Sequence, residues 1–551
     1  MDRGLRLTQI VIGFLCVALV ASLFLFGMVG GGAPPDQEPT VAPTSEGPRE
    51  VADGERLPGE LARPLSDIDR FDVDETLNPD RQLAHEPAGE PQVEFAEPLA
   101  DLRAYAEQGV DWKACGETFL CARVLAPLDW EDPSRAAVEL ALLMNPSADA
   151  TNGPLFVNPG GPGAGGSDFA ASFPADHWPG FDIVGWDPRG TGASTHVVCG
   201  TLEQTDALMD LDATPDDDAE DQALQDGFRD FAQQCRDSSG ELLDHISSVE
   251  VARDMDLLRH LLGADEFNFF GVSYGTYIGA MYAELFPDTS GRLVLDGAVE
   301  ITDEDSIYQI EGFERAFANW ADWCEEQDVC VLTGQPSADL QQEISDWIGS
   351  LDASPLAVGD RMLTQTHAAT GIAMFLYGDE SVYRALAMTI QEAMRGEGAT
   401  LLNAADQLNG RGGGAYDTLA YAFPAMHCVD WPDLGVDVVP ELAEDGFARA
   451  PMLGRHMGIS YVCETWTAEP APPYRLTAEG ADPILVVGTT GDSATPYEQA
   501  ERMAAQLEPA VLLTYDGPGH GAVTGNNPCV AEIVGGYLAD GTLPEEGARC
   551  T

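Results

Sequence analysis

The segment G-V-S-Y-G-T at residues 271–276 places a serine between two glycines, each two positions away from it. Residues 265–270 before it are rich in aromatic side chains, as in a strand, and residues 274–286 after it carry apolar side chains at helical spacing. A strand, a tight turn and a helix in this order would expose the Ser273 hydroxyl at a helix N-terminus, where negative charge is stabilised. The glycines allow the strained turn and the close approach of its neighbours. Ser273 is therefore the candidate nucleophile.

A serine hydroxyl is a weak nucleophile, so a base and an acid must activate it. The motif is typical of the nucleophile elbow of an α/β-hydrolase, in which an acid and then a histidine follow the serine along the chain. His520 has flexible glycines on both sides in G-P-G-H-G-A, after an apolar run at 510–515 that predicts the last strand. His520 is therefore the candidate base. The other histidines after Ser273 are His367, His427 and His456.

The candidate acid is Asp492. It follows the continuous apolar run 483–488, which is typical of a buried parallel strand. The carboxyl end of such a strand is where open α/β sheets build their sites. Thr495 and Pro496 then begin a helix as its N-cap and first residue. The alternative acid is Asp296 at the end of L-V-L-D, because some hydrolases carry the acid one strand earlier.

Acyl transfer also needs two N–H donors that point at the oxygen of the tetrahedral intermediate. One is expected at Tyr274, directly after the nucleophile. The second is expected in the glycine-rich loop N-P-G-G-P-G-A-G-G at 158–166, at Gly161, with Gly160 as the alternative. The loop lacks the G-K-[ST] of a phosphate-binding loop, and the single lysine of the chain is Lys113. An oxyanion hole is therefore the favoured interpretation.

These motifs resemble the secreted tripeptidyl aminopeptidases of actinobacteria, which are prolyl-aminopeptidase-like serine peptidases of the α/β-hydrolase superfamily. The resemblance covers residues 108–551 and includes G-W-D-P-R-G-T-G-A-S at 185–194, G-D-S-A-T-P and G-H-G-A-V-T-G-N-N-P-C-V. It implies that the serine, aspartate and histidine above form a catalytic triad, with Thr495 helping to orient the site. Asp187 and Arg189 belong to a family motif and are expected to hold the loop beside the oxyanion hole.

The resemblance implies an aminopeptidase that releases short, tripeptide-like N-terminal peptides. Because the family also contains envelope proteases and esterases, a carboxylesterase or lipase with the same triad is the alternative. A catalytically silent binding module on this fold is a third possibility. An aminopeptidase needs a carboxylate for the substrate ammonium group, and the residues alone do not choose among the acidic side chains of the predicted cap. These include Glu300, Glu311, Asp322, Glu325 and Asp430.

Ten of the eleven cysteines lie outside the N-terminal apolar stretch that contains Cys16. An even number outside the membrane suggests disulfide bonds. No C-x-x-C is present, so a structural zinc site is not expected, nor is any other metal or cofactor. Spacing does not prove the connectivity, and the family resemblance supports only the last of the nearest-neighbour pairs. These pairs are Cys115–Cys121, Cys199–Cys235, Cys324–Cys330, Cys428–Cys463 and Cys529–Cys550.

The N-terminal segment 1–32 contains Arg3 and Arg6, then an apolar stretch at 10–29. Twenty helical residues span about 30 Å, the thickness of a bilayer core. This is longer than the apolar region of most cleavable signals, so an uncleaved anchor is favoured over a signal peptide. Residues 33–100 are acidic and rich in proline, which predicts a disordered stalk. An extracytoplasmic protein, membrane-anchored or secreted, is expected.

The chain has 93 acidic and 27 basic side chains and a net charge of −66. Nucleic acid and anionic membrane surfaces would be repelled, because binding to them requires basic patches. Membrane contact is therefore expected only through the N-terminal segment. Peptide or protein substrates are the expected partners, and a monomer is the expected state.

The charge also predicts a salt dependence. Screening by salt weakens repulsion among the acidic side chains. We therefore expect the thermal unfolding temperature to rise from low salt to molar NaCl. Unchanged or falling stability in the same titration would count against adaptation to high salt.

Apolar runs alternate with helical segments, which predicts an α/β fold with a mostly parallel sheet covered on both faces. The hydrolase core is expected at 101–300 and 476–551. The intervening segment, 301–475, is too long for one crossover and predicts an inserted, mainly helical cap, with Phe313, Trp320 and Trp323 in its core. The predicted strands are 137–145, 153–158, 181–186, 266–272, 292–296, 483–488 and 510–515.

Overall fold

The computed structural model describes nine stretches of the chain. None of the helices in them has the length and hydropathy of a membrane span. The segment 1–32, predicted as an anchor or signal, lies outside the described residues. The described stretches are 47–52, 54–71, 87–116, 118–178, 180–302, 309–431, 435–470, 473–523 and 527–551.

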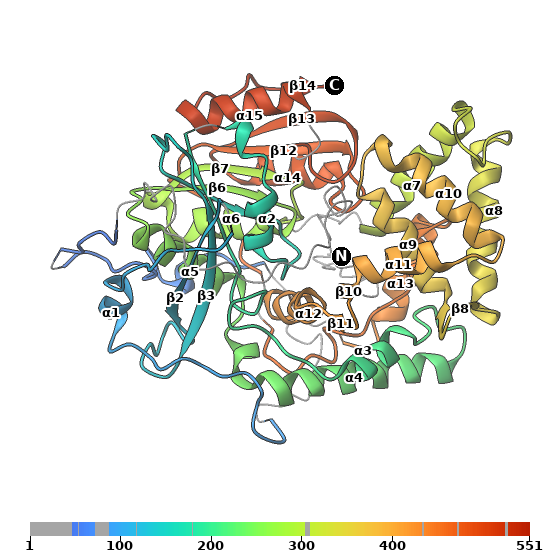
Figure 1. Cartoon of the computed structure of the whole chain (residues 1–551), viewed down its shortest axis with the longest axis horizontal. Coiled ribbons are helices and arrows are strands. Elements are labelled where there is room, and N and C mark those ends of the chain that lie inside the picture. Colours follow the sequence, from blue (N-terminus) through green and yellow to red (C-terminus); the bar gives the residue numbers. More distant parts are fainter. Residues whose placement is uncertain are drawn as a thin grey trace, which may run out of the picture.

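The described residues contain a central sheet of ten strands in the order β1-β2-β3-β5-β4-β6-β7-β12-β13-β14 (Figure 1). The pairs β1–β2, β2–β3 and β3–β5 are antiparallel, and the remaining pairs are parallel. All seven predicted strands are present, and the predicted fold class is confirmed. The strands are β1 (Lys113–Ala114), β2 (Leu120–Pro127), β3 (Ala137–Asn145), β4 (Pro154–Asn158), β5 (Asp182–Trp186), β6 (Phe267–Val272), β7 (Ser290–Asp296), β12 (Ile484–Gly491), β13 (Ala510–Pro518) and β14 (Arg549–Cys550).

Helices cover both faces of the sheet, because parallel neighbours need crossover connections. On one face, α5 (Ser248–Leu261), α6 (Tyr274–Leu285) and α14 (Tyr497–Gln506) pack against side chains such as Phe267 and Phe269. On the other face, α2 (Gly166–Ser172) and α15 (Pro528–Asp540) pack against side chains such as Phe270 and Val272. The alternation of Phe269 and Phe270 between the two cores follows from the two-residue period of a strand.

A group of helices with a shared core forms a separate unit beside the sheet (Figure 1). This unit has its own hydrophobic core, in which Phe313 and Trp320 are fully buried and Trp323 is packed at the edge. These aromatic residues therefore stabilise this helical unit. The helices are α7 (Gln309–Glu326), α8 (Ser337–Ala353), α9 (Gln365–Leu376), α10 (Glu380–Met394) and α11 (Ala399–Leu408), with the hairpin of β8 (Leu356–Val358) and β9 (Arg361–Leu363).

Most described residues in the second half of the predicted cap segment pack outside the core of these helices, although Ala450, Leu453 and Met457 belong to it. Helix α12 (Leu419–Asp430) and residues such as Tyr461 and Trp466 belong to the core beneath the sheet, not to the core of the five helices. The disulfide Cys428–Cys463 joins these two parts. The segment 301–475 is thus one insertion in the sequence but not one packing unit.

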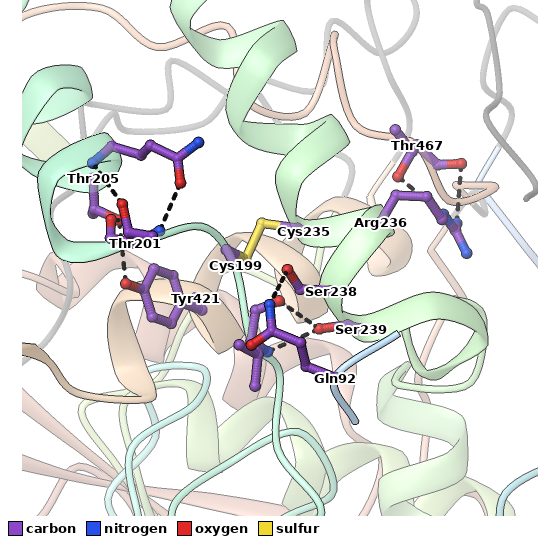
Figure 2. The surroundings of a disulfide bond; sticks show 12 residues. Gln92, Cys199, Thr201, Thr205, Cys235, Arg236, Ser238, Ser239, Tyr421 and Thr467 are labelled. Carbon is purple, nitrogen blue, oxygen red and sulfur yellow. Dashed lines mark hydrogen bonds between the residues drawn. A yellow bond between two sulfur atoms is a disulfide. The ribbon is translucent and has the colours of Figure 1, made fainter. Parts of the chain in front are cut away.

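Helices α3 (Leu202–Met209) and α4 (Asp218–Ser239) attach this second half to the hydrolase core (Figure 2). The disulfide Cys199–Cys235 joins the loop before α3 to α4. Arg236 of α4 is buried and donates to the Thr467 carbonyl oxygen at 3.1 Å. The Thr205 hydroxyl lies 3.1 Å from the Tyr421 hydroxyl of α12. All five nearest-neighbour disulfides of the sequence analysis are formed in the described residues.

The described part of the segment predicted as a stalk lies against the hydrolase core. Ile68 and Phe71 are buried. The Gly59 carbonyl oxygen accepts from Arg253 at 2.9 Å, and the Gly59 N–H donates to Asp256 at 2.9 Å. This packing differs from the expectation of a free stalk, because a few apolar side chains within a polar composition are sufficient to anchor the segment.

The side chain of His456 predicts that the cap loses stability at acidic pH. It is 5% exposed, its Nε2 lies 2.8 Å from the Ser345 hydroxyl, and burial lowers its pKa to about 4. The unfolded chain titrates near pH 6.5. The stability from neutral, buried His456 is therefore complete above pH 6.5 and is lost as the pH falls towards 4.

We expect His456→Gln to remove this part of the pH dependence, because glutamine can still bond Ser345 but does not titrate. The difference in unfolding free energy between wild type and variant should change by about 3 kcal/mol between pH 7 and pH 4. Denaturant titrations at several pH values measure it. Parallel curves for the two proteins would contradict the prediction.

Candidate active site

Ser273 occupies a strained turn between β6 and α6. Its φ is 56°, a left-handed conformation that non-glycine residues adopt only at some energetic cost. A Cβ on Gly271 would lie 2.5 Å from the Gly275 carbonyl oxygen, and one on Gly275 would lie 2.9 Å from the Asn158 carbonyl oxygen. Both glycines of the motif are therefore required by close backbone contacts. The turn is held by the Ser273 N–H, which donates to the Asp296 carbonyl oxygen at 3.0 Å.

His520 and Asp492 are in direct contact at the carboxyl ends of β12 and β13. The Nδ1 atom of His520 lies 2.8 Å and 3.0 Å from the two carboxylate oxygens of Asp492. Both side chains are buried. The N–H groups of Ala494 and Thr495 donate to Asp492 Oδ1 at 2.9 Å and 2.8 Å, which fixes the carboxylate. The Thr495 hydroxyl lies 3.2 Å from His520 Nδ1, beside the acid.

Asp296, the alternative acid, has a different set of partners. Its carboxylate accepts the N–H groups of Ala522 at 2.9 Å and 3.0 Å and of Val523 at 2.9 Å. Burial raises its pKa to about 6. Asp296 therefore anchors the backbone just after His520, whereas Asp492 contacts the imidazole itself.

The second ring nitrogen of His520 is available for chemistry. Its Nε2 atom is buried and has no hydrogen-bond partner in the described part of the chain, so the bond to the Ser273 hydroxyl is not formed. The backbone places the ring near the elbow, because a Cβ on Gly297 would lie 3.3 Å from His520 Cε1. Gly297 directly follows Asp296, whose carbonyl oxygen binds the Ser273 N–H. Catalytic hydrogen bonds are often long before substrate binds.

The glycine-rich loop packs directly on the elbow. A Cβ on Gly160 would lie 2.8 Å from the Tyr274 nitrogen, and the φ of Gly160 is 92°. The Gly160 N–H donates to the Asn158 side chain at 2.8 Å. Within the described residues, the Gly161 N–H has no acceptor. Asn158 is the first residue of the loop motif but was not a predicted site residue.

Helix α12 lies across this loop. Its first residue, Leu419, would contact a Cβ on Gly161 at 3.3 Å, and a Cβ on Gly163 would lie 2.7 Å from Ala422 Cβ. Its last residue, Asp430, accepts the Tyr274 hydroxyl at 2.5 Å. Both ends of α12 therefore reach the elbow region.

Asp187 and Arg189 hold the backbone around the site. Asp187 accepts the N–H groups of Ser167 at 2.9 Å and Ala193 at 2.8 Å, which joins the start of α2 to the following loop. Arg189 is fully buried and forms a bidentate ion pair with Asp254 of α5, at 2.7 Å and 2.8 Å. This geometry supports the structural role expected from the sequence.

The remaining histidines lie elsewhere. His367 and His456 are buried, and burial lowers both pKa values. His427 is half-buried on α12, and burial lowers its pKa to about 4. Among the described residues, the group of side chains close enough to share a metal ion is Asp216, Asp217 and Glu220, at the start of α4. It is a solvent-facing acidic cluster and not part of the site.

A parallel α/β sheet, a strained serine at a helix N-terminus and a buried aspartate–histidine pair define a serine hydrolase of the α/β-hydrolase fold. Residues 450–550 match a family described as TAP-like protein. The serine protease Hip1 of Mycobacterium tuberculosis is 33% identical over 80% of this chain and 91% of its own length. Carboxylesterase B of the same species is 36% identical over 80% of this chain and 89% of its own length.

A tripeptidyl aminopeptidase of Streptomyces lividans is 29% identical over 82% of this chain and 88% of its own length. The similarity to these relatives extends over nearly their whole length. The chain belongs to the TAP-like serine hydrolases of the α/β-hydrolase superfamily. Its relatives include both peptidases and an esterase.

Proposed function

We propose that the protein is an extracytoplasmic aminopeptidase that releases short N-terminal peptides through an acyl-enzyme. The observation that carries this proposal is the contact of Asp492 with His520 Nδ1, which leaves Nε2 near the elbow and without a partner among the described residues. An imidazole held in this way is prepared to take a proton from the Ser273 hydroxyl. Ser273 would then attack the scissile carbonyl carbon.

In the next step the oxyanion needs two donors. The Tyr274 N–H at the start of α6 is one, and the Gly161 N–H is the other, because the Gly160 N–H is already bonded to Asn158. Loss of one such donor typically costs about 3 kcal/mol of transition-state stabilisation. His520 would return the proton to the leaving amine, and water would release the acyl group from Ser273. Asp492 stabilises the imidazolium throughout.

Peptide cleavage is supported by the relatives named serine protease and tripeptidyl aminopeptidase. The relative named carboxylesterase supports hydrolysis of esters as the second candidate, because the same triad can perform both reactions. The two reactions differ in the leaving group that His520 must protonate and in recognition of a substrate ammonium group.

Substrate pairs separate the two activities. We expect tripeptide anilides with a free amine to be cleaved with a higher kcat/KM than the same anilides with an acetylated amine. Equal cleavage of both would argue against an aminopeptidase, and turnover of p-nitrophenyl esters alone would favour the esterase.

An extracytoplasmic location is supported by the disulfide bonds of the described residues, which form and persist in oxidising compartments. Peptide or protein substrates fit this location, and we propose a monomer as the working state. Labelling of intact cells with a membrane-impermeant fluorophosphonate tests the location: protein labelled only after lysis would contradict it.

A further inference from the structure

Five acidic residues near the cap are candidates for binding the amine of a peptide substrate, and the structure gives four of them other partners. Glu300 pairs with Arg502 at 2.8 Å, and Glu311 pairs with Arg449 at 3.4 Å. Asp322 and Glu325 are exposed and bind the side chain and the N–H of Ser337 at the start of α8. Asp430 differs from all of these.

Asp430 is buried at the end of α12, next to the residue that follows the nucleophile. Its Oδ2 accepts the Tyr274 hydroxyl at 2.5 Å and the Ser248 hydroxyl at 2.7 Å. Among the described residues, its Oδ1 accepts one hydrogen bond, from the Ser248 N–H at 2.9 Å. A carboxylate oxygen can accept two hydrogen bonds, so Oδ1 retains capacity for another donor. In the described part of the chain, no lysine or arginine lies within ion-pair distance of Asp430.

A cavity of about 120 Å³ adjoins Asp430. Its wall includes a second carboxylate, Glu250, and the rings of Tyr277 and Tyr474. Glu250 also lacks a cationic partner among the described residues. The Arg70 guanidinium lies 4.3 Å from the centre of the Tyr474 ring, so a cation of this chain already occupies that wall. The two carboxylates and the Tyr277 ring remain for a second, small cation.

The surface between the oxyanion loop and this cavity is apolar and aromatic. The half-buried rings of Phe423, His427 and Trp431 follow one another along α12, with centroid distances of 5.7 Å and 6.3 Å. The ring centroids of Trp431 and Tyr277 are 5.2 Å apart, and those of Tyr277 and Tyr274 are 5.6 Å apart. Because its low pKa keeps His427 neutral at pH 7, this surface adds no positive charge.

We propose that Asp430 binds the N-terminal ammonium group of a peptide whose carbonyl carbon lies at Ser273. The assignment rests on the proposed aminopeptidase function and makes α12 the surface on which the released peptide lies.

The test compares Asp430→Asn with wild type on a tripeptide p-nitroanilide, its N-acetylated counterpart and p-nitrophenyl acetate. We expect KM for the free-amine peptide to rise about 10- to 100-fold, because a hydrogen bond between two charged groups is lost. The kcat/KM values for the acetylated peptide and the ester should change less than about twofold. Glu311→Gln, which removes another carboxylate near the cap, should leave all three substrates unaffected.

If Asp430 only positions neighbouring residues and does not contact the substrate, the expected result is different. Ser248→Ala removes a partner of the same carboxylate but keeps its charge, so it should affect all three substrates equally. If Asp430→Asn also lowers activity equally on all three, or if the preference for the free amine survives in that variant, the assignment is wrong. A wild-type enzyme with no preference for the free amine would overturn the proposed function as well. Thermal unfolding of each variant establishes that it is folded.

Discussion

Ser273→Ala is expected to lower kcat about a million-fold, because the covalent route to the acyl-enzyme is lost as a unit. Binding should be nearly unchanged, since the hydroxyl is small and the oxyanion donors remain. The thermal unfolding temperature should stay close to that of wild type, because alanine in this turn has the same positive φ of 56°. Steady-state kinetics measures the loss, and a fluorophosphonate probe should label wild type but not the variant.

A matched control is available on the neighbouring strand. Ser290 of β7 is buried, and its hydroxyl has no hydrogen-bond partner among the described residues. Ser290→Ala should retain both activity and labelling. Residual labelling of Ser273→Ala at the wild-type rate would show that another nucleophile performs the reaction.

Asp492→Asn is expected to lower kcat about 10,000-fold, as loss of the triad acid does in other serine hydrolases. An amide can present its N–H₂ to His520 Nδ1, which favours the wrong imidazole tautomer. The amide also cannot stabilise the imidazolium. The pH dependence of kcat should also change in this variant, because the negative charge beside the imidazole is removed.

Asp296→Asn is the comparison that separates the two acids. Asp296 binds the N–H groups of Ala522 and Val523 and does not contact the imidazole of His520. We expect this variant to lose at least 100-fold less activity than Asp492→Asn. Kinetics of both variants under one set of conditions shows which aspartate is the acid of the triad. The reverse order of losses would identify Asp296 as the acid of the triad.

The local parts of the site were predictable because short segments carry their own geometry. Gly271 is required by a contact within the elbow motif itself, because a Cβ there would lie 2.5 Å from the Gly275 carbonyl oxygen. Most of the seven predicted strands are buried parallel strands with short apolar runs, which is why the sequence predicts them. β2 was missed: its buried and half-exposed positions alternate, and Arg123 is exposed in its middle.

Other features depended on contacts between distant segments. Asp492 follows a parallel strand and Asp296 ends one, so the sequence favours Asp492 and leaves Asp296 as the alternative; the fold decides which one faces His520. Gly160 and Gly161 are adjacent, and only the bond from Gly160 to Asn158 separates their roles. Composition averaged over 33–100 concealed the few apolar residues, including Ile68 and Phe71, that pack on the core.

The amino-acid sequence by itself indicated the type of chemistry, the candidate nucleophile, acid and base, seven of the strands and the cysteines available for pairing. These features follow from covalent spacing and from apolar periodicity along one segment. Only the tertiary structure decided which carboxylate meets the imidazole, which half of 301–475 joins the main core and where Asp430 lies relative to Tyr274. The reason is physical: each of these contacts joins residues far apart in the chain, and packing alone brings them within hydrogen-bond distance.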